Sequence, residues 1–159
     1  MSGGPDAVVG ALNLHAVALV VGEAGLLIRG GSGAGKTRLA LALVDAARRD
    51  GTFASLVADD RALVSRHGDR LVARPHPALA GLAERRGFGI LPVAHEPACA
   101  LVLVVDLVAG WPERLPQPDA RRCEISRVVL PRLAVAAEAS TPDAVVLILS
   151  VLAASCGQA

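Results

Sequence analysis

Residues 30–37, GGSGAGKT, have the composition of a phosphate-binding loop. They match the pattern G-x-x-x-x-G-K-[ST], with Gly30, Gly35, Lys36 and Thr37 at the fixed positions. Glycine lets a backbone approach phosphate oxygens closely, and the N–H groups at a helix N-terminus attract anions. In such loops the lysine neutralises terminal phosphates and the hydroxyl binds Mg²⁺. The predicted phosphate contacts are Gly30, Gly31, Ser32, Gly33, Ala34, Gly35, Lys36 and Thr37.

Two acidic segments are candidates for the carboxylate that P-loop proteins place near the metal ion. Asp59 and Asp60 end the run SLVADD, and Asp106 ends the longer apolar run LVLVVD. The apolar pattern alone favours Asp106. Chemistry favours the pair, because adjacent carboxylates repel each other and one of them can orient metal-bound water while the other exchanges a proton with a hydroxyl. A helix or turn cap is the alternative interpretation.

Two further residues are interpretable in two ways. Glu84 stands in GLAERRGFGIL, before a turn rich in glycine and arginine, and alone it is typical of an exposed turn. His15 opens an apolar run, where a lone histidine is more often structural than catalytic. The other histidines are expected on surfaces or loops, and they are His67, His76 and His95.

The segments around the loop predict an α/β fold, a P-loop-containing mixed β-sheet with flanking helices. The predicted strands cover residues 14–21, 25–28, 55–58, 62–66, 70–73 and 98–107, and the predicted helix covers residues 37–49. Residues 62–73 are typical of a hairpin, which makes a mixed sheet more plausible than a parallel one. The proline-rich residues 109–122 predict a loop, and the tail, residues 124–152, is predicted to be rich in strands.

Length and charge limit the possible classes of protein. A chain of 159 residues is sufficient for a single domain, residues 1–159. The formal net charge of +1 gives no general attraction to nucleic acid or membranes. Neither a targeting segment nor an apolar run long enough to cross a bilayer is recognisable. Three cysteines, Cys99, Cys123 and Cys156, are interpreted as small buried apolar residues, which suits the cytoplasm.

Four segments in this order resemble the catalytic domain of HPr kinase/phosphorylase, a family that acts on the phosphocarrier protein HPr. They are LHAVAL (14–19), GGSGAGKT (30–37), LVADD (56–60) and GLAERRGFGIL (81–91). The resemblance implies a fold related to phosphoenolpyruvate carboxykinase and an ATP- and Mg²⁺-dependent serine kinase. It also implies a phosphorylase reaction that consumes inorganic phosphate and yields pyrophosphate, an HPr-like partner, and a homo-oligomer that in the family is a hexamer.

The resemblance also implies a role for each matching residue. Asp59 matches the proton-transferring aspartate, Asp60 its neighbour near the metal ion, and His15 the histidine beside the proton-transferring aspartate. Glu84 matches an acidic residue that binds Mg²⁺, and Arg114 in ERLP would bring positive charge to the reaction centre. The implied catalytic set is Asp59, His15, Lys36 and Arg114, and the implied metal ligands are Thr37, Asp60 and Glu84.

The chain also departs from the family pattern. The separate N-terminal domain of the long members does not appear, so we expect a short form of the family. Thr37 replaces the usual serine, Arg85 stands where valine or isoleucine is usual, and the C-terminal region is hard to match.

Two other functions therefore remain open. One is a P-loop kinase of a small metabolite or nucleotide, and the other is a nucleotide-sensing regulatory module without transfer activity. A GTPase is disfavoured, because the sequence contains no NKxD-like segment.

Overall fold

The computed structural model describes residues 10–156 of the chain, except for the side chain of Cys156. Its largest element is a nine-stranded sheet whose main path runs β1-β5-β6-β9-β3-β2-β4, while β11 pairs with β9 and with β10. The strands are β1 (Leu12–Leu14), β2 (Ala16–Val21), β3 (Ala24–Arg29), β4 (Ala54–Ala58), β5 (Ala62–His67), β6 (Arg70–Pro75), β9 (Cys99–Val108), β10 (Arg122–Ile125) and β11 (Val128–Ala136).

The sheet is mixed, as the sequence predicted. Strand β9 runs parallel to β3 on one side and to β11 on the other. The strands β5 and β6 form the expected antiparallel hairpin, and β2 is antiparallel to both β3 and β4. This order brings the ends of β3 and β4 to the two sides of β2, so the phosphate loop and the paired aspartates approach each other.

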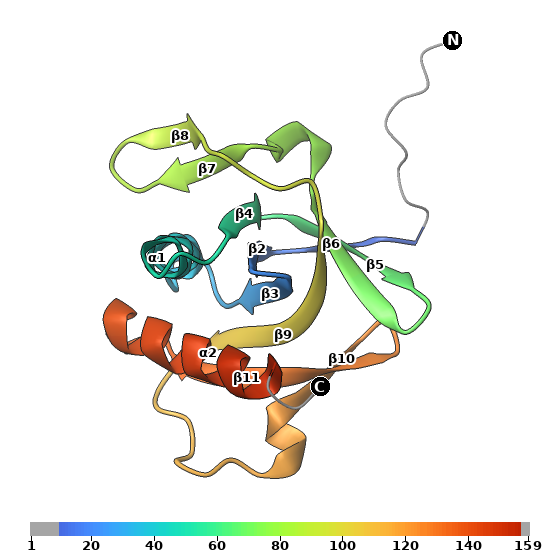
Figure 1. The fold of residues 1–159 in the computed structure, drawn as a ribbon, viewed down its shortest axis with the longest axis vertical. Helices are drawn as coiled ribbons and strands as arrows, with labels where there is room; N and C mark the ends of the chain where they lie inside the picture. The colour runs from blue at the N-terminus through green and yellow to red at the C-terminus, as the bar shows by residue number, and fades with distance from the viewer. Residues whose placement is uncertain (1–9, 157–159) are drawn as a thin grey trace.

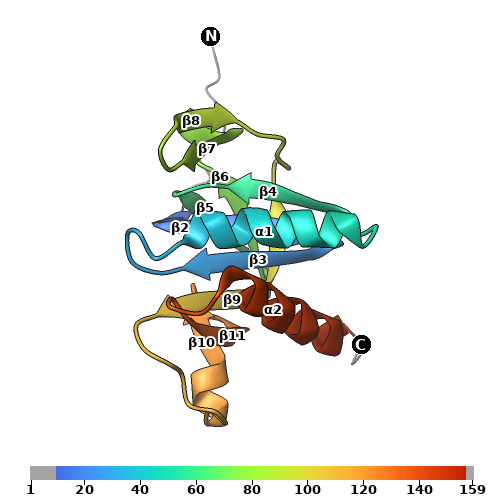
Figure 2. The same cartoon turned by 90° about the vertical axis from the view of Figure 1, so that its left-hand side faces the viewer.

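Two helices cover the same face of the sheet (Figures 1 and 2). They are α1 (Lys36–Arg49), which follows β3, and α2 (Thr141–Cys156), which ends the described chain. A separate hairpin of β7 (Leu82–Arg85) and β8 (Gly89–Pro92) lies beyond β4, at the top of Figure 1. Two short 3₁₀ helices complete the fold, η1 (Pro77–Leu79) and η2 (Pro118–Arg121).

Strand β2 contributes to hydrophobic cores on both faces of the sheet. Val17 and Leu19 pack with Leu43 of α1 and Ile148 of α2, whereas Ala18 belongs to the core on the opposite face. Successive side chains of a strand point to opposite faces. Burial on both faces therefore accounts for the uninterrupted apolar run of this strand.

The prediction for the C-terminal tail is partly wrong. Strands β10 and β11 lie where strands were expected, but residues 141–156 form α2. Ser140 Oγ accepts a hydrogen bond from the N–H of Asp143 at 3.3 Å, and Pro142 stands in the first turn, which are both signals of a helix start. The segment is apolar on every side, and such a segment shows no periodicity that separates a helix from a strand.

The cysteines agree in part with their predicted burial. Cys99 is buried, and burial raises the pKa of its thiol to about 12. Cys123 is half-buried, and the predicted burial of Cys156 falls on a side chain outside the described residues. Across residues 10–156, no helix has the length and apolar character that a membrane span requires.

Candidate active site

The loop between β3 and α1 forms one wall of a cleft. Gly35 stands at the N-terminus of α1 with φ of 94°, and Gly33 has φ of 78°, both in the left-handed region that favours glycine. A Cβ at Gly30 would lie 3.0 Å from the Cβ of Leu107, because the loop passes close to β9. Gly35 caps α1 without a side chain, so the first N–H groups of the helix are available to an anion.

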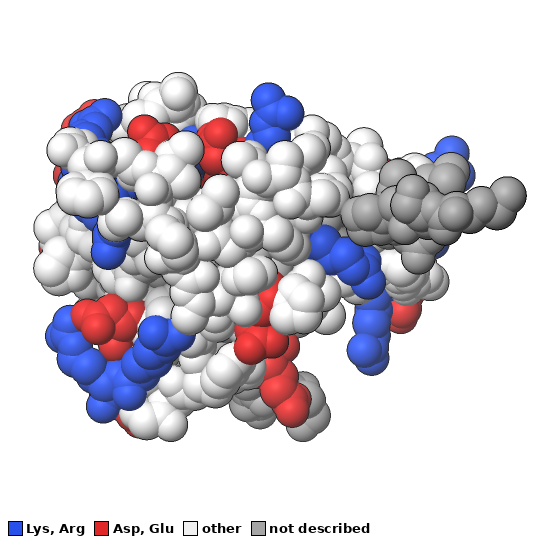
Figure 3. Space-filling view, turned by 90° about the horizontal axis from the view of Figure 1, so that it is seen from above, with Lys and Arg blue, Asp and Glu red and all other residues white. Residues whose placement is uncertain are grey.

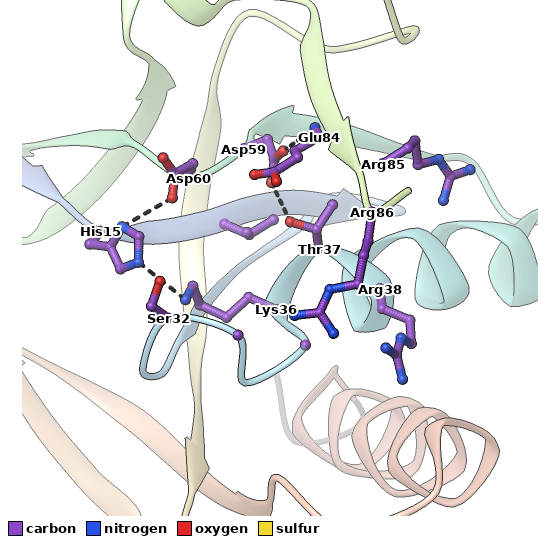
Figure 4. A pocket seen from close by; sticks show the side chains of 13 residues that line it. His15, Ser32, Lys36, Thr37, Arg38, Asp59, Asp60, Glu84, Arg85 and Arg86 are labelled. Carbon is purple, nitrogen blue, oxygen red and sulfur yellow. Dashed lines mark hydrogen bonds and ion pairs between the residues drawn. The ribbon is translucent and has the colours of Figure 1, made fainter. Parts of the chain in front are cut away.

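Lys36 lies inside the loop rather than in solvent. Its side chain is buried, and Nζ donates hydrogen bonds to the carbonyl oxygens of Gly30 at 2.9 Å and Gly31 at 3.0 Å. The same nitrogen lies 3.4 Å from Nε2 of His15 (Figure 4). The positive charge is therefore held at the place where the loop geometry would receive a phosphate.

Asp59 connects the phosphate loop to the β7–β8 hairpin. It follows β4 directly and is buried. Its Oδ1 accepts a hydrogen bond from the hydroxyl of Thr37 at 2.6 Å, and its Oδ2 accepts one from the backbone N–H of Glu84 at 2.9 Å. A carboxylate beside the P-loop hydroxyl is the arrangement with which P-loop proteins hold Mg²⁺.

The side-chain oxygens of Thr37 and Asp59 fit a magnesium ion. Within residues 10–156, no group of three or more His, Cys, Asp or Glu side chains forms a metal site alone. Mg²⁺ does not require such a group, because it usually binds one or two carboxylates, several waters and substrate phosphates. Thr37 Oγ1 and a carboxylate of Asp59 are the first available ligands, and the side chain of Glu84 lines the same cleft.

Asp60 turns away from Asp59 and pairs with His15. Its Oδ1 lies 3.1 Å from Nδ1 of His15, and both side chains are about half exposed. The backbone of Asp60 has φ of 66°, and its carbonyl accepts a hydrogen bond from the N–H of Ala16 at 3.2 Å, at the start of β2. The printed contact of His15 is therefore with Asp60, whereas Asp59 lines the same cleft beside Thr37.

A cleft of about 580 Å³ brings most of the expected residues together. Its lining includes His15, Lys36, Thr37, Asp59, Asp60 and Glu84, together with Ser32, Gly33 and Gly35 of the loop. Arg114 is not among the lining residues. It is exposed in the loop between β9 and η2, which Figure 2 shows at the opposite end of the molecule from the β7–β8 hairpin.

Three arginines that the sequence analysis did not assign to the site also line the cleft. They are Arg38, Arg85 and Arg86, and all three are exposed. Arg38 directly follows Thr37, and Arg85 and Arg86 stand in the segment that contains Glu84. The sequence signal that could have identified these arginines is their position beside the phosphate loop and the glycine-rich turn.

Asp106, the alternative acid, is engaged elsewhere. Its carboxylate accepts hydrogen bonds from Arg29 at 2.7 and 2.8 Å and from Nε of Arg132 at 2.5 Å. Burial raises the pKa of Asp106, but the hydrogen bonds from the two guanidinium groups hold it below its ordinary value. The residue therefore links β3, β9 and β11 and is outside the lining of the cleft.

Charge is distributed in small groups over the end of the molecule where the β7–β8 hairpin lies. On the face that Figure 3 shows, Lys and Arg side chains form separate groups next to acidic ones, and most of that face is uncharged. With a formal net charge of +1, the electrostatics of the protein depend on local sites such as the cleft.

Comparison with protein families and solved structures gives a consistent result. Residues 7–100 match the family model described as the HPr Serine kinase C-terminal domain. The chain is 38% identical over 113 residues to an HPr kinase/phosphorylase of Neisseria meningitidis serogroup B, which covers 66% of this chain and 33% of the relative. It is 32% identical over 112 residues to one of Mycoplasma mycoides subsp. mycoides SC, which covers 66% and 34%.

A solved structure shares the fold. The structure of the Hpr(Ser) kinase/phosphatase from Coxiella burnetii superposes with a TM-score of 0.73 and 24% sequence identity, and covers 92% of this chain and 97% of that chain. The present chain spans about a third of the length of the curated relatives that it matches. The mixed sheet with flanking helices is therefore confirmed, and the similarity in sequence is concentrated in the part of the chain that contains the cleft.

Proposed function

Because the chain belongs to the HPr serine kinase C-terminal domain family, we propose that it transfers a phosphoryl group from ATP to a seryl hydroxyl of an HPr-like phosphocarrier protein. One observation supports this most directly: the phosphate loop and both adjacent aspartates line the same cleft. Thr37 donates a hydrogen bond to Asp59, and Asp60 faces His15. A polyphosphate held at Lys36 would therefore lie within reach of both carboxylates.

The loop supplies the donor site in this proposal. The N–H groups at the start of α1 bind the β- and γ-phosphates, and Lys36 exchanges its carbonyl partners for phosphate oxygens. Bound Mg²⁺ would neutralise charge on those oxygens during transfer. Thr37, Asp59 and Glu84 are the residues proposed to hold the metal ion.

Two contacts support an exchange of the roles that the family resemblance suggested for the aspartates. Asp59 is buried and accepts hydrogen bonds from Thr37 and from the N–H of Glu84. Its oxygens therefore lie beside Thr37 and Glu84, the other two residues proposed to hold the metal ion. Asp60 is half exposed beside His15, where an acceptor protein has access. We therefore assign proton transfer to Asp60 and metal orientation to Asp59.

The transfer step forms one bond to the γ-phosphorus and breaks another. The seryl oxygen attacks the γ-phosphorus in line, its proton passes to the carboxylate of Asp60, and the bond between phosphorus and the bridging oxygen of ADP breaks. His15, at 3.1 Å from Asp60 and 3.4 Å from Lys36, orients both groups. In the phosphorylase reaction, inorganic phosphate attacks the phosphorus of phosphoserine, the bond between phosphorus and the seryl oxygen breaks, protonated Asp60 gives its proton to that oxygen, and pyrophosphate forms.

The supporting experiment is mass spectrometry of an HPr protein after incubation with this chain, ATP and Mg²⁺. One added phosphoryl group on a serine is the expected result. Transfer to a metabolite panel instead of HPr would identify a small-molecule kinase. Nucleotide binding without transfer to either acceptor would identify a regulatory module.

The assembly and the compartment belong to the same proposal. Exposed apolar side chains, including Val146 and Leu147 of α2 and Trp111 after β9, support association with further copies of the chain. We propose a homo-oligomer, with the hexamer of the family as the expected form. The free thiols of Cys99 and Cys123 support a reducing compartment, the cytoplasm.

A further inference from the structure

The cleft has two chemically different ends (Figure 4). His15 and Asp60 occupy one end, and Lys36 and Thr37 lie in the middle. Beyond Lys36 and Thr37 the cleft is lined by Arg38 of α1 and by Arg85 and Arg86 of the β7–β8 hairpin. The guanidinium group of Arg86 reaches back to the phosphate loop, whereas Arg38 and Arg85 extend away from the loop. A linear ligand that spans the cleft would therefore meet a proton-accepting group at one end and the arginines Arg38 and Arg85 at the other.

The arginine end opens into a second hollow. This hollow has a volume of about 410 Å³ and shares Arg38 and Arg85 with the cleft. Its apolar side is formed by Leu41, Ala42 and Val44 of α1. Arg38, Leu41 and Ala42 are three and four positions apart, so they lie on one face of the helix, beside the hairpin residue Arg85.

The arginines at this end have no ion-pair partner in the described part of the chain. Among residues 10–156, no carboxylate forms an ion pair with Arg38, Arg85 or Arg86. Asp45, the acidic residue of the hollow, pairs with Arg49. Positive charges that line one hollow repel each other, and a bound anion would relieve that repulsion. The arrangement is therefore suited to an anionic group next to the phosphate loop.

The direction of the donor follows from the proposed function, on which this inference rests. The γ-phosphate must lie near Asp60, because the seryl proton passes to that carboxylate. The remainder of the donor then runs over Lys36 and Thr37 toward the arginines. Pyrophosphate is short enough to be held by the loop alone, whereas the α-phosphate and nucleoside of ATP extend beyond it.

We infer that the second hollow is the nucleoside subsite of the donor, and that Arg38 and Arg85 make this chain select a nucleoside triphosphate over pyrophosphate. Arg38 binds the α-phosphate, because it directly follows the metal-binding Thr37 in the first turn of α1. Arg85 places its planar guanidinium group over the base, which packs against Leu41 and Ala42.

Binding measurements on the full chain with Mg²⁺ separate these roles. The ligands are a non-hydrolysable ATP analogue, inorganic triphosphate and pyrophosphate, and the method is isothermal titration calorimetry. Arg38→Ala should weaken both ATP-analogue and triphosphate binding by about tenfold, since each loses a charge-assisted hydrogen bond. Arg85→Ala should weaken only the ATP analogue, because triphosphate carries no base. Neither substitution should change the affinity for pyrophosphate.

Two further variants serve as controls. Arg38→Lys should recover part of the triphosphate affinity, whereas Arg85→Lys should recover little, because an ammonium group does not stack as a guanidinium group does. Arg70→Ala, an exposed substitution outside both hollows, should leave all three affinities unchanged.

Other outcomes would overturn the inference. An equal loss of affinity for all three ligands would show that the arginines act on polyphosphate in general. Unchanged binding of the ATP analogue by both alanine variants would show that the two arginines do not contact the nucleotide. In both cases the proposed function would stand, whereas an unmodified protein that bound none of the three ligands would remove the proposed function as well.

Discussion

The hydroxyl of Thr37 donates a 2.6 Å hydrogen bond to Oδ1 of Asp59, although the two residues are 22 positions apart in the sequence. This contact joins the start of α1 to the end of β4, on either side of the space that a metal-bound phosphate would occupy. We expect Thr37→Val to weaken Mg²⁺-dependent ATP binding by about 10- to 100-fold, since the hydroxyl is lost. Thr37→Ser should keep near-normal affinity in the same calorimetric titration.

Lys36 is predicted to be required for binding and turnover together. Lys36→Ala removes the charge that the loop carbonyls of Gly30 and Gly31 hold in place, and the affinity for ATP should fall by about 100-fold. Titration with ATP and a phosphoryl-transfer assay check the two effects. Arg70→Ala is the control, and transfer at the normal rate by the Lys36 variant would exclude the donor site proposed above.

Substitutions of Asp59 and Asp60 are predicted to impair different steps of the reaction. Asp60→Asn should spare nucleotide binding and slow transfer to HPr by about 10²- to 10⁴-fold, the range for loss of a general base. Asp59→Asn should instead weaken Mg²⁺-dependent nucleotide binding, because that side chain contacts Thr37. The measurements are calorimetric titration and single-turnover kinetics. The opposite pattern would restore the assignment that the family resemblance implies, with Asp59 as the proton acceptor.

The carboxylate of Asp106 is predicted to stabilise the fold and to make it acid-sensitive. Hydrogen bonds from Arg29 and Arg132 hold the pKa of Asp106 below its ordinary value despite burial. The unfolded chain therefore takes up this proton first, so the contribution is fully present above about pH 4 and is lost as the pH falls further. Asp106→Asn should lower the free energy of unfolding by about 2–3 kcal/mol at pH 7.

Urea unfolding at pH 7 and pH 3 tests this prediction. The difference between the variant and the unmodified protein should become smaller at the lower pH. Asp45→Asn, which removes an exposed pair with Arg49 on α1, should change stability by less than about 1 kcal/mol. A difference for Asp106→Asn that stayed constant with pH would contradict the assigned role of the charge.

Features that depend on local sequence were predicted well. The loop and α1 follow from a glycine-rich segment between two apolar runs, and the strand β9 from its uninterrupted apolar residues. The helix α2 was missed because its apolar residues show no face, although Ser140 and Pro142 carry a start signal. Local patterns therefore identified the elements, but not the type of an element that is apolar on every side.

Features that depend on long-range contacts were not predictable in this way. The hydrogen-bond donors to Asp106 are Arg29, 77 positions away, and Arg132, 26 positions away. The residues near Asp106 in the sequence do not indicate that two arginines will contact it. The pairing of His15 with Asp60 depends on a single left-handed residue at the end of β4. Likewise, Arg38 and Arg85 line the same hollow although they are far apart in the sequence.

The hydrogen bond from the N–H of Glu84 to Asp59 attaches the small two-stranded sheet to the large one. The carboxylate of Asp59 thereby contacts both sides of the cleft, the phosphate loop through Thr37 and the hairpin through Glu84. A ligand that bound one of these oxygens would act on the phosphate loop and the hairpin at the same time. The distance between the hairpin and the phosphate loop therefore depends on how the two oxygens of Asp59 are divided among Thr37, Glu84 and the ligand.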